Sequence, residues 1–293
     1  MTFSVVIATK DRAGFLARTL DSLAAQRDAP PFEVVVVDNG SHDATPQLLA
    51  ARSSGTSFGL RSVHVAQPNR GAARNAGIAA ATGTSVAFVD DDVWLPERFL
   101  AAHAAAQRAA GAVTVSGPIL NVPGYATRPK PAWSNYSGAF LCTCNVSVPR
   151  AALLAVGGFD EAFDLYGWED TELGLRLRRS GVRRVFAWDA YLWHIKPPRS
   201  ETLEVLYAKT VERAQMAARL LRKDGSLRTR LATGAYQPNL ARSALLAPHW
   251  SLRAYRALAT SARVPGPLRS LARAQLLDGA YTSTLRRALA RAP

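Results

Sequence analysis

The sequence is poor in cysteine and has no long apolar run. Its two cysteines, Cys142 and Cys144, stand one residue apart, and that spacing strains any disulfide between them. We interpret them as ordinary buried thiols of a reducing compartment and not as a zinc site. No stretch approaches the ~18 apolar residues that a membrane span requires. Charged residues follow the first apolar run, 3–8, at once, so we expect neither a spanning helix nor a signal peptide.

Acidic residues are scarce in the last third of the chain. Residues 201–293 contain 16 Lys and Arg against 5 Asp and Glu, a net charge of +11, whereas residues 1–200 carry +3. Such a basic segment favours an anionic partner, which could be a membrane surface, nucleic acid or acidic glycan. Its arginine clusters lie beside Leu and Ala, as in peripheral membrane helices, but a solvated surface around packed helices has the same composition.

What the sequence does have is a regular alternation of strand and helix patterns over the first 110 residues. Four apolar, β-branched runs predict strands, and the segments between them have helical spacing or composition. This order predicts an α/β fold with a parallel sheet and helices on both faces. The expected strands are 3–9, 33–41 with its closing turn, 61–66 and 85–89, and the expected helices are 13–26, 44–52, 71–83 and 96–110.

Single residues mark the expected helix ends. Asp43 is a candidate N-cap of the second helix, and Pro96 should begin the fourth. Gly83 and Gly111 should end the third and fourth helices. Beyond them we expect short strands in 112–148, helix over much of 149–180 and a strand within 182–194. From 201 a helical extension follows, with turns near 224–226, 233–238 and 264–267.

Three consecutive carboxylates, Asp90, Asp91 and Asp92, follow the fourth predicted strand. Alternation along a strand places Asp90 and Asp92 on the same side. Ligands of open α/β sheets bind at the carboxyl ends of strands, and hard oxygen ligands suit Mg²⁺ or Mn²⁺. The cluster therefore predicts a cation site, the alternative being a solvated acidic turn.

Glu169 and Asp170 follow Gly167-Trp168 where a helix should begin. The helix dipole favours their ionised forms, and an ionised carboxylate can take a proton from an attacking hydroxyl. Helix capping alone would also place acidic residues there.

Three further features have both a functional and a structural interpretation. Asp38-Asn39 could contact a base or ribose, or could simply form a turn. Arg74 lies near a helix start that could bind an anion, or on a solvated basic face. His194, between Trp193 and Ile195, is either a ligand or a buried core residue.

Taken together and in order, these motifs resemble the family 2 glycosyltransferases with the GT-A fold. The resemblance spans roughly residues 3–198. It rests on SVVIATKDR, VVVVDNGSHD, NRGAARNAGIAAATG, FVDDDVWLP, NVSVPR, GGFDEAFDLYGWEDTELGLRLRRSG and the late histidine. The first loop departs from the family, because it has Thr-Lys-Asp-Arg where an aromatic-Asn pair is frequent.

The resemblance implies a role for each motif. Asp170 matches the general base, and Glu169 beside it and Trp168 line the acceptor site. The positions implied to bind the nucleotide or donor sugar are Thr9, Asp11, Arg12, Asp38, Asn39, Arg74, Asp90, Asp91 and Asn145.

A divalent cation, Mn²⁺ or Mg²⁺, is implied as well. Asp92 matches its ligand in the family's DxD motif, Asp90 binds the ribose or belongs to the metal's shell, and His194 completes the site in some relatives. The implied organisation is a GT-A domain over 1–200, with a nucleotide-binding half 1–110 and an acceptor and catalytic half 111–200, followed by the basic extension 201–293.

The activity implied is transfer of a sugar, with inversion, from a nucleotide-diphosphate sugar. UDP is the commonest nucleotide of the family. The acceptor hydroxyl would belong to a glycan, a lipid-linked or a small molecule in polysaccharide or glycolipid synthesis. We expect a cytoplasmic protein, with contact to the inner face of an anionic membrane through 201–293 as an option, and no nucleic acid.

Three alternatives remain open at this point. A nucleotidyltransferase would need a Gly-rich phosphate loop after the first strand, and residues 8–12 do not form one. A non-catalytic basic scaffold on membrane or nucleic acid would leave the acidic motifs unexplained. An inactive relative could bind the sugar nucleotide alone.

Overall fold

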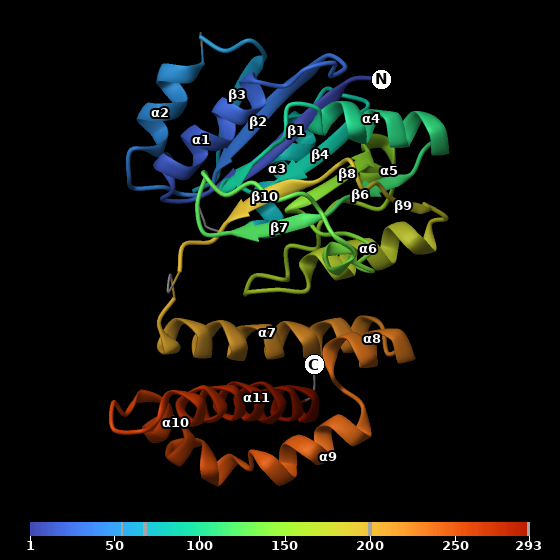
Figure 1. Ribbon diagram of the computed structural model, residues 1–293. Coiled ribbons are helices and arrows are strands. Elements are labelled where there is room, and N and C mark those ends of the chain that lie inside the picture. The colour runs from blue at the N-terminus through green and yellow to red at the C-terminus, as the bar shows by residue number, and fades with distance from the viewer. Residues whose placement is uncertain (54, 67–68, 199–200, 292–293) are drawn as a thin grey trace. The chain divides into compact units, whose positions relative to one another are not determined.

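The computed structural model describes residues 1–53, 55–66, 69–198 and 201–291 (Figure 1). The chain divides into two compact units. The first comprises Met1–Asp164 and Glu169–Pro198, and the second comprises Leu165–Trp168 and Arg199–Pro293. The domain boundary predicted after residue 200 touches residues 199–200, which lie outside the described residues, so it stays a prediction. The grouping of Leu165–Trp168 with the second unit was not foreseen.

A seven-stranded sheet in the order β3-β2-β1-β4-β8-β6-β9 forms the centre of the first unit. The first four strands in the chain are parallel, as predicted, whereas β8 runs antiparallel to both β4 and β6 (Figure 1). The strands are β1 (Phe3–Thr9), β2 (Phe32–Asp38), β3 (Gly59–His64), β4 (Ser85–Val89), β6 (Thr114–Ser116), β8 (Asn145–Pro149) and β9 (Arg184–Phe186).

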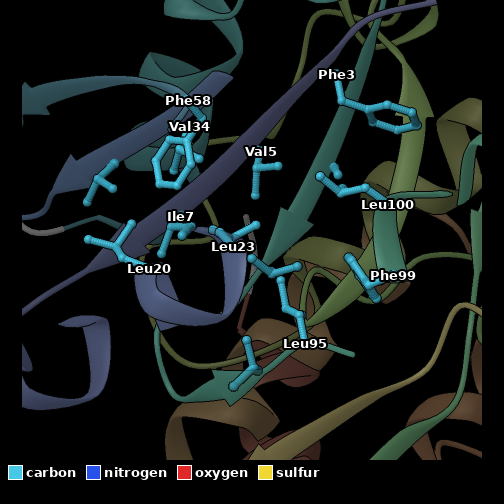
Figure 2. Close-up of a cluster of buried hydrophobic side chains, with 14 of the residues drawn as sticks. Phe3, Val5, Ile7, Leu20, Leu23, Val34, Phe58, Leu95, Phe99 and Leu100 are labelled. Carbon is cyan, nitrogen blue, oxygen red and sulfur yellow. The ribbon is translucent and has the colours of Figure 1, made fainter. Parts of the chain in front are cut away.

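The four valines of β2 explain why helices cover both faces of this sheet. Successive side chains of a strand point to opposite faces. Val34 and Val36 pack into one buried cluster with α1, whose Leu20 and Leu23 are drawn in Figure 2. Val35 and Val37 pack into a second cluster on the other face, which includes residues of α3 and α6. The helices of this unit are α1 (Ala13–Ala24), α2 (Thr45–Arg52), α3 (Arg70–Ala80), α4 (Phe99–Ala110), α5 (Arg150–Ala155) and α6 (Glu169–Arg179).

The ends of three helices differ from the predictions. Helix α3 ends at Ala80, three residues before Gly83. Gly83 serves another purpose, because a Cβ there would lie 2.6 Å from the backbone of Phe3 and Ser4. Helix α4 begins at Phe99 and not at Pro96, although Gly111 does end it with a φ of +82°. The N-cap of α2 is Ala44, and Asp43 accepts a hydrogen bond from the Thr45 backbone instead.

A small second sheet in the order β5-β10-β7 adjoins the acidic segment. Its strands are β5 (Val93–Trp94), β7 (Ile119–Val122) and β10 (Leu192–Ile195). The predicted strand within 182–194 is therefore two strands, β9 and β10, in different sheets. Pairing of His194 with Val93 brings the late histidine next to the residues that follow β4.

The second unit is helical, as predicted for the extension. Its helices are α7 (Leu203–Lys223), α8 (Leu227–Thr233), α9 (Gln237–Leu246), α10 (Leu252–Thr260) and α11 (Gly266–Ala290), with a short 3₁₀ turn at His249–Ser251. The long helix α11 packs against α7, α9 and α10. The predicted turns near 224–226 and 233–238 separate α7, α8 and α9. Among the described residues, no helix combines the length and apolarity that a membrane crossing demands.

Candidate active site

The three carboxylates after β4 have three different environments. Asp91 is buried and accepts hydrogen bonds from the Thr9 hydroxyl at 2.7 Å and from Arg12 at 3.2 Å. Asp92 pairs with Arg12 at 2.6 Å and with Nε2 of His194 at 3.1 Å. Strand β1 lies beside β4, so the loop after β1 brings Thr9 and Arg12 to the acidic cluster. One guanidinium thereby offsets the repulsion between two neighbouring carboxylates.

Burial and pairing separate the pKa values of Asp91 and Asp92. Burial raises the pKa of Asp91 to about 6, against the opposing effects of the Thr9 hydroxyl and Arg12. Burial would also raise the pKa of Asp92, but hydrogen bonds and charge interactions with His194 and Arg12 outweigh it and lower that pKa. Asp92 is therefore ionised at neutral pH, and Asp91 is the carboxylate that titrates near pH 6.

Asp90 belongs to a different group of possible ligands. Its carboxylate, the thiol of Cys144 and the imidazole of His194 place one ligand atom each within 4.8 Å of one another. Oxygen, sulfur and nitrogen donors in this number fit a divalent cation. The predicted set of Asp92, Asp90 and His194 is thus brought together in part, because Asp92 contacts His194 but is also paired with Arg12.

The sequence analysis missed Cys144, which it interpreted as an ordinary buried thiol. The usable signal was its place directly before β8, whose first residue, Asn145, pairs with Val89 at the end of β4. An antiparallel pairing of those two segments places Cys144 beside Asp90.

Asp170 lies on the first turn of α6 and is held by Thr143. The Thr143 backbone N–H and hydroxyl donate to its carboxylate at 2.9 and 3.0 Å. Burial raises the pKa of Asp170 to about 6, opposed first by Arg74, although 23% of the side chain remains exposed. A carboxylate with this pKa is mostly ionised at neutral pH and is a stronger base than an ordinary aspartate. Thr143 is a second residue that the sequence analysis missed.

Arg74 connects the two acidic groups. It extends from α3 to Glu169 at 3.1 Å and to Asp170 at 3.9 Å, and its guanidinium lies over the ring of Phe159. Its positive charge also interacts with Asp90, so the one guanidinium of Arg74 stabilises three carboxylates. The second carboxylate oxygen of Glu169 is buried and has no hydrogen-bond partner within the described part of the chain. The predicted base and the predicted cation site therefore share one neighbour.

The residues after β1 and β2 form a hydrogen-bonded edge beside this cluster. Asp38 accepts a hydrogen bond from the Ser41 backbone at 2.9 Å, the turn considered as its structural alternative. Asp11 has a φ of +52°, and its N–H donates to the Ser41 hydroxyl at 2.9 Å. Asn39 accepts from the backbone of Asn69, the N-cap of α3. These hydrogen bonds form the edge, and contact between this edge and a nucleoside stays a prediction.

Two predicted site residues have other partners. Asn145 is buried, and its amide donates to the carbonyls of Pro118 and Ala190 and accepts from His103. Its polar atoms are thus engaged within the protein. Trp168 belongs to the second unit, where its Nε1 donates to the Arg213 carbonyl at 2.9 Å. Its predicted acceptor contact remains a prediction.

A hollow of about 850 Å³ is lined by Trp94, Tyr191, Trp193, Arg128 and Asp189, among others. None of the carboxylates of the acidic clusters lines it. Because neighbouring residues of a strand point to opposite faces, Trp193 and His194 face opposite sides of the small sheet. The hollow is therefore separate from the candidate active site.

Two protein-family models match the chain. One, glycosyl transferase family 2, matches residues 4–147, and the other, the N-terminal domain of galactosyltransferase, matches residues 127–205. The validoxylamine A glucosyltransferase of Streptomyces hygroscopicus subsp. limoneus is 31% identical over 244 residues, 69% of this chain and 52% of that protein. The succinoglycan biosynthesis protein ExoM of Rhizobium meliloti is 27% identical over 220 residues, 70% of this chain and 71% of ExoM. The chain spans about half the length of the first of these relatives.

Solved structures share the fold. The mannosyltransferase PcManGT of Pyrobaculum calidifontis, in complex with GDP-Man and Mn²⁺, has a TM-score of 0.62 at 22% identity, covering 97% of this chain and 86% of that one. S. aureus TarS in complex with UDP has a TM-score of 0.57 at 23% identity, covering 98% and 90%. The fold and the edge of carboxylates thus define the GT-A class. The chain belongs to glycosyl transferase family 2 through the domain that the first model matches, which confirms the resemblance.

Proposed function

We propose that this protein transfers a sugar from a nucleotide-diphosphate sugar to an acceptor hydroxyl. The observation that carries the proposal is the carboxylate of Asp170, whose pKa is raised to about 6 and which lies 3.9 Å from Arg74. Arg74 in turn interacts with Asp90 in the candidate cation site. A base beside a site for a cation suits a sugar transfer in which a hydroxyl loses a proton and a diphosphate leaves.

The proposed chemistry divides between two groups of residues. Asp170 takes the proton from the acceptor hydroxyl as its oxygen attacks the anomeric carbon. The bond from that carbon to the diphosphate oxygen breaks, and negative charge builds on the leaving diphosphate. Attack from the face opposite the leaving group inverts the anomeric centre. Thr143 holds the base, and Arg74 keeps it ionised.

Asp90 and His194, with Asp92 beside them, would hold the divalent cation, Mn²⁺ or Mg²⁺ by family resemblance. A bound cation acts as a Lewis acid and offsets the charge that develops on the diphosphate. In this proposal Thr9, Asp11, Asp38 and Asn39 border the nucleoside at the ends of β1 and β2.

We propose a UDP-sugar as the donor and a glycan or lipid-linked molecule as the acceptor. Two comparisons support this proposal: TarS has been solved with UDP and with UDP-GlcNAc, and ExoM is named for succinoglycan biosynthesis. A role in polysaccharide synthesis and a location in the cytoplasm belong to the same proposal.

A peripheral contact of the second unit with an anionic membrane is a further part of the proposal. Leu245 and Trp250 are 80% and 82% exposed, and Arg253 and Arg256 follow within two turns. Exposed apolar side chains beside cations are the composition of helices that lie in a lipid interface. A lipid-linked acceptor would be met at such a surface.

The test is donor turnover with Asp170→Asn. A panel of sugar nucleotides, with and without Mn²⁺, identifies the donor by the rise in melting temperature it causes. Release of the nucleoside diphosphate then reports transfer to water or to an added acceptor. We expect Asp170→Asn to keep the thermal shift and lose most of the release, whereas Asp189→Asn, in the separate hollow, keeps both. Near-normal release by Asp170→Asn would refute the base.

A further inference from the structure

The position of Cys144 follows from the pairing of β4 with β8. Val89 and Asn145 are the last paired residues of this antiparallel ladder, and the residues just beyond them are Asp90 and Cys144. The thiol is buried and hydrogen-bonded to the Asp90 carboxylate. Cys144 therefore lies at the end of the strand pair, where its side chain also belongs to the buried cluster on one face of the sheet.

A third strand brings the histidine to the same place. His194 pairs with Val93 across β10 and β5, and the N–H of Ile195 donates to the Asp92 carbonyl at 2.8 Å. Backbone hydrogen bonds thus position the chain at all three residues: Asp90 directly follows β4, Cys144 directly precedes β8, and His194 lies within β10. The three ligand atoms lie within 4.8 Å of one another. In the chain, 54 positions separate Asp90 from Cys144 and 50 separate Cys144 from His194.

We propose that Cys144 is a metal ligand and that the centre is Asp90–Cys144–His194, a site for Zn²⁺ or Co²⁺ in preference to Mg²⁺. The thiol loses its proton to solvent as the metal–sulfur bond forms. The inference rests on the proposed function in one respect only: a diphosphate oxygen of the donor would take the open position.

The chemistry of the donors decides the choice of metal. Mg²⁺ prefers six oxygen ligands in octahedral geometry and binds thiolates poorly. Zn²⁺ and similar borderline metals accept oxygen, nitrogen and sulfur in one tetrahedral set. Three protein ligands with the fourth position free for substrate is the usual arrangement of a catalytic zinc site. A single sulfur thus changes the expected cofactor from the Mn²⁺ or Mg²⁺ implied by resemblance.

The rival explanation is that Cys144 donates a hydrogen bond to Asp90 and does not bind the metal. A serine in its place would keep a donor of similar size, so under this explanation Cys144→Ser leaves metal binding unchanged. Cys142 supplies the matched control, because it is the other thiol of the same turn and is not one of the three grouped ligands.

The experiment is a cobalt titration of the metal-free full chain. Thiolate-to-Co²⁺ charge transfer gives a near-ultraviolet absorption band that oxygen and nitrogen ligands alone do not give. We expect the band in the wild type and in Cys142→Ser, and its loss in Cys144→Ser with Co²⁺ bound at least ~10-fold more weakly, the lower end for disturbing a metal site. Zn²⁺ should abolish the band, and equimolar Mg²⁺ should not.

X-ray absorption of the zinc-loaded wild type tests the same point without any variant. A sulfur neighbour at about 2.3 Å is expected. Absence of that neighbour, absence of the cobalt band in the wild type, or the same band in Cys144→Ser would each overturn the proposal. None of these measurements needs sugar transfer. A band without diphosphate release refutes the proposed activity alone, and release without a band refutes the sulfur ligand alone.

Discussion

Replacing Thr143 by valine tests the assignment of the base through its pKa. The Thr143 hydroxyl donates to the Asp170 carboxylate at 3.0 Å, while the backbone N–H of the same residue donates separately at 2.9 Å. Both hydrogen bonds favour the ionised carboxylate and lower its pKa. Valine has nearly the shape of threonine and removes only the hydroxyl. The change should therefore raise the pKa of Asp170 further.

The size of that rise follows from general values. A hydrogen bond to a charged group contributes about 1.5–3 kcal/mol, and one pKa unit corresponds to about 1.4 kcal/mol. Water replaces part of the lost bond at a carboxylate that is 23% exposed, so we expect a rise of about one unit. With a pKa of about 6, half of the base is ionised at pH 6; with about 7, roughly one tenth is. Diphosphate release at pH 6 should thus fall about fivefold, and near pH 8 it should hardly change.

The assay is the pH dependence of kcat/KM for diphosphate release. Activity requires the ionised base, so kcat/KM falls as the pH drops through the pKa. The acid limb of the pH profile should therefore move to higher pH in Thr143→Val. Thr143→Ser keeps the hydroxyl and should keep the limb near its original place. Asp91 also has a pKa of about 6, so Thr9→Val serves as the competing test. A limb that moves in Thr9→Val and stays in Thr143→Val would refute Asp170 as the titrating base.

Three other predictions concern separate parts of the molecule. Asp92→Ala should weaken metal-dependent nucleotide binding, because it removes the carboxylate that holds His194 at 3.1 Å; an unchanged metal titration would contradict this. Gly83→Ala should destabilise the fold by about 1–3 kcal/mol through overpacking, measured by thermal unfolding, whereas Gly138→Ala has open space and serves as the control. Liposome co-sedimentation should show binding to anionic vesicles at low salt and its loss when Leu245 and Trp250 become serine; binding that survives both changes would exclude this surface.

Much of the fold was predictable because local patterns and sheet geometry agree. The run Val34 to Val37 predicts a strand covered on both faces, and the structure buries alternate valines in the two clusters. Helix ends were less predictable because tertiary contacts override local signals. The sequence predicts a helix end at Gly83, but a side chain is excluded there because β1 approaches closely.

The candidate site was predictable wherever a residue follows a strand or begins a helix. Such positions gather at one edge of the sheet, and the structure accordingly brings Thr9, Arg12, Asp91 and Asp92 into contact. Asn145 shows the limit of the argument. As the first residue of β8 it has the expected place, but its amide is engaged by two carbonyls and a histidine inside the protein.

Ion pairs with two arginines explain why so many acidic side chains can lie at one edge of the sheet. Arg12 neutralises part of the charge of Asp91 and Asp92, and Arg74 does the same for Glu169 and Asp170. Within the described part of the chain Asp90 forms no ion pair with a guanidinium; the Cys144 thiol is hydrogen-bonded to it, and Arg74 interacts with it through its charge. Among these carboxylates it is therefore the one whose charge remains for a cation, and its position beside Cys144 and His194 is where that cation has other ligands to bind.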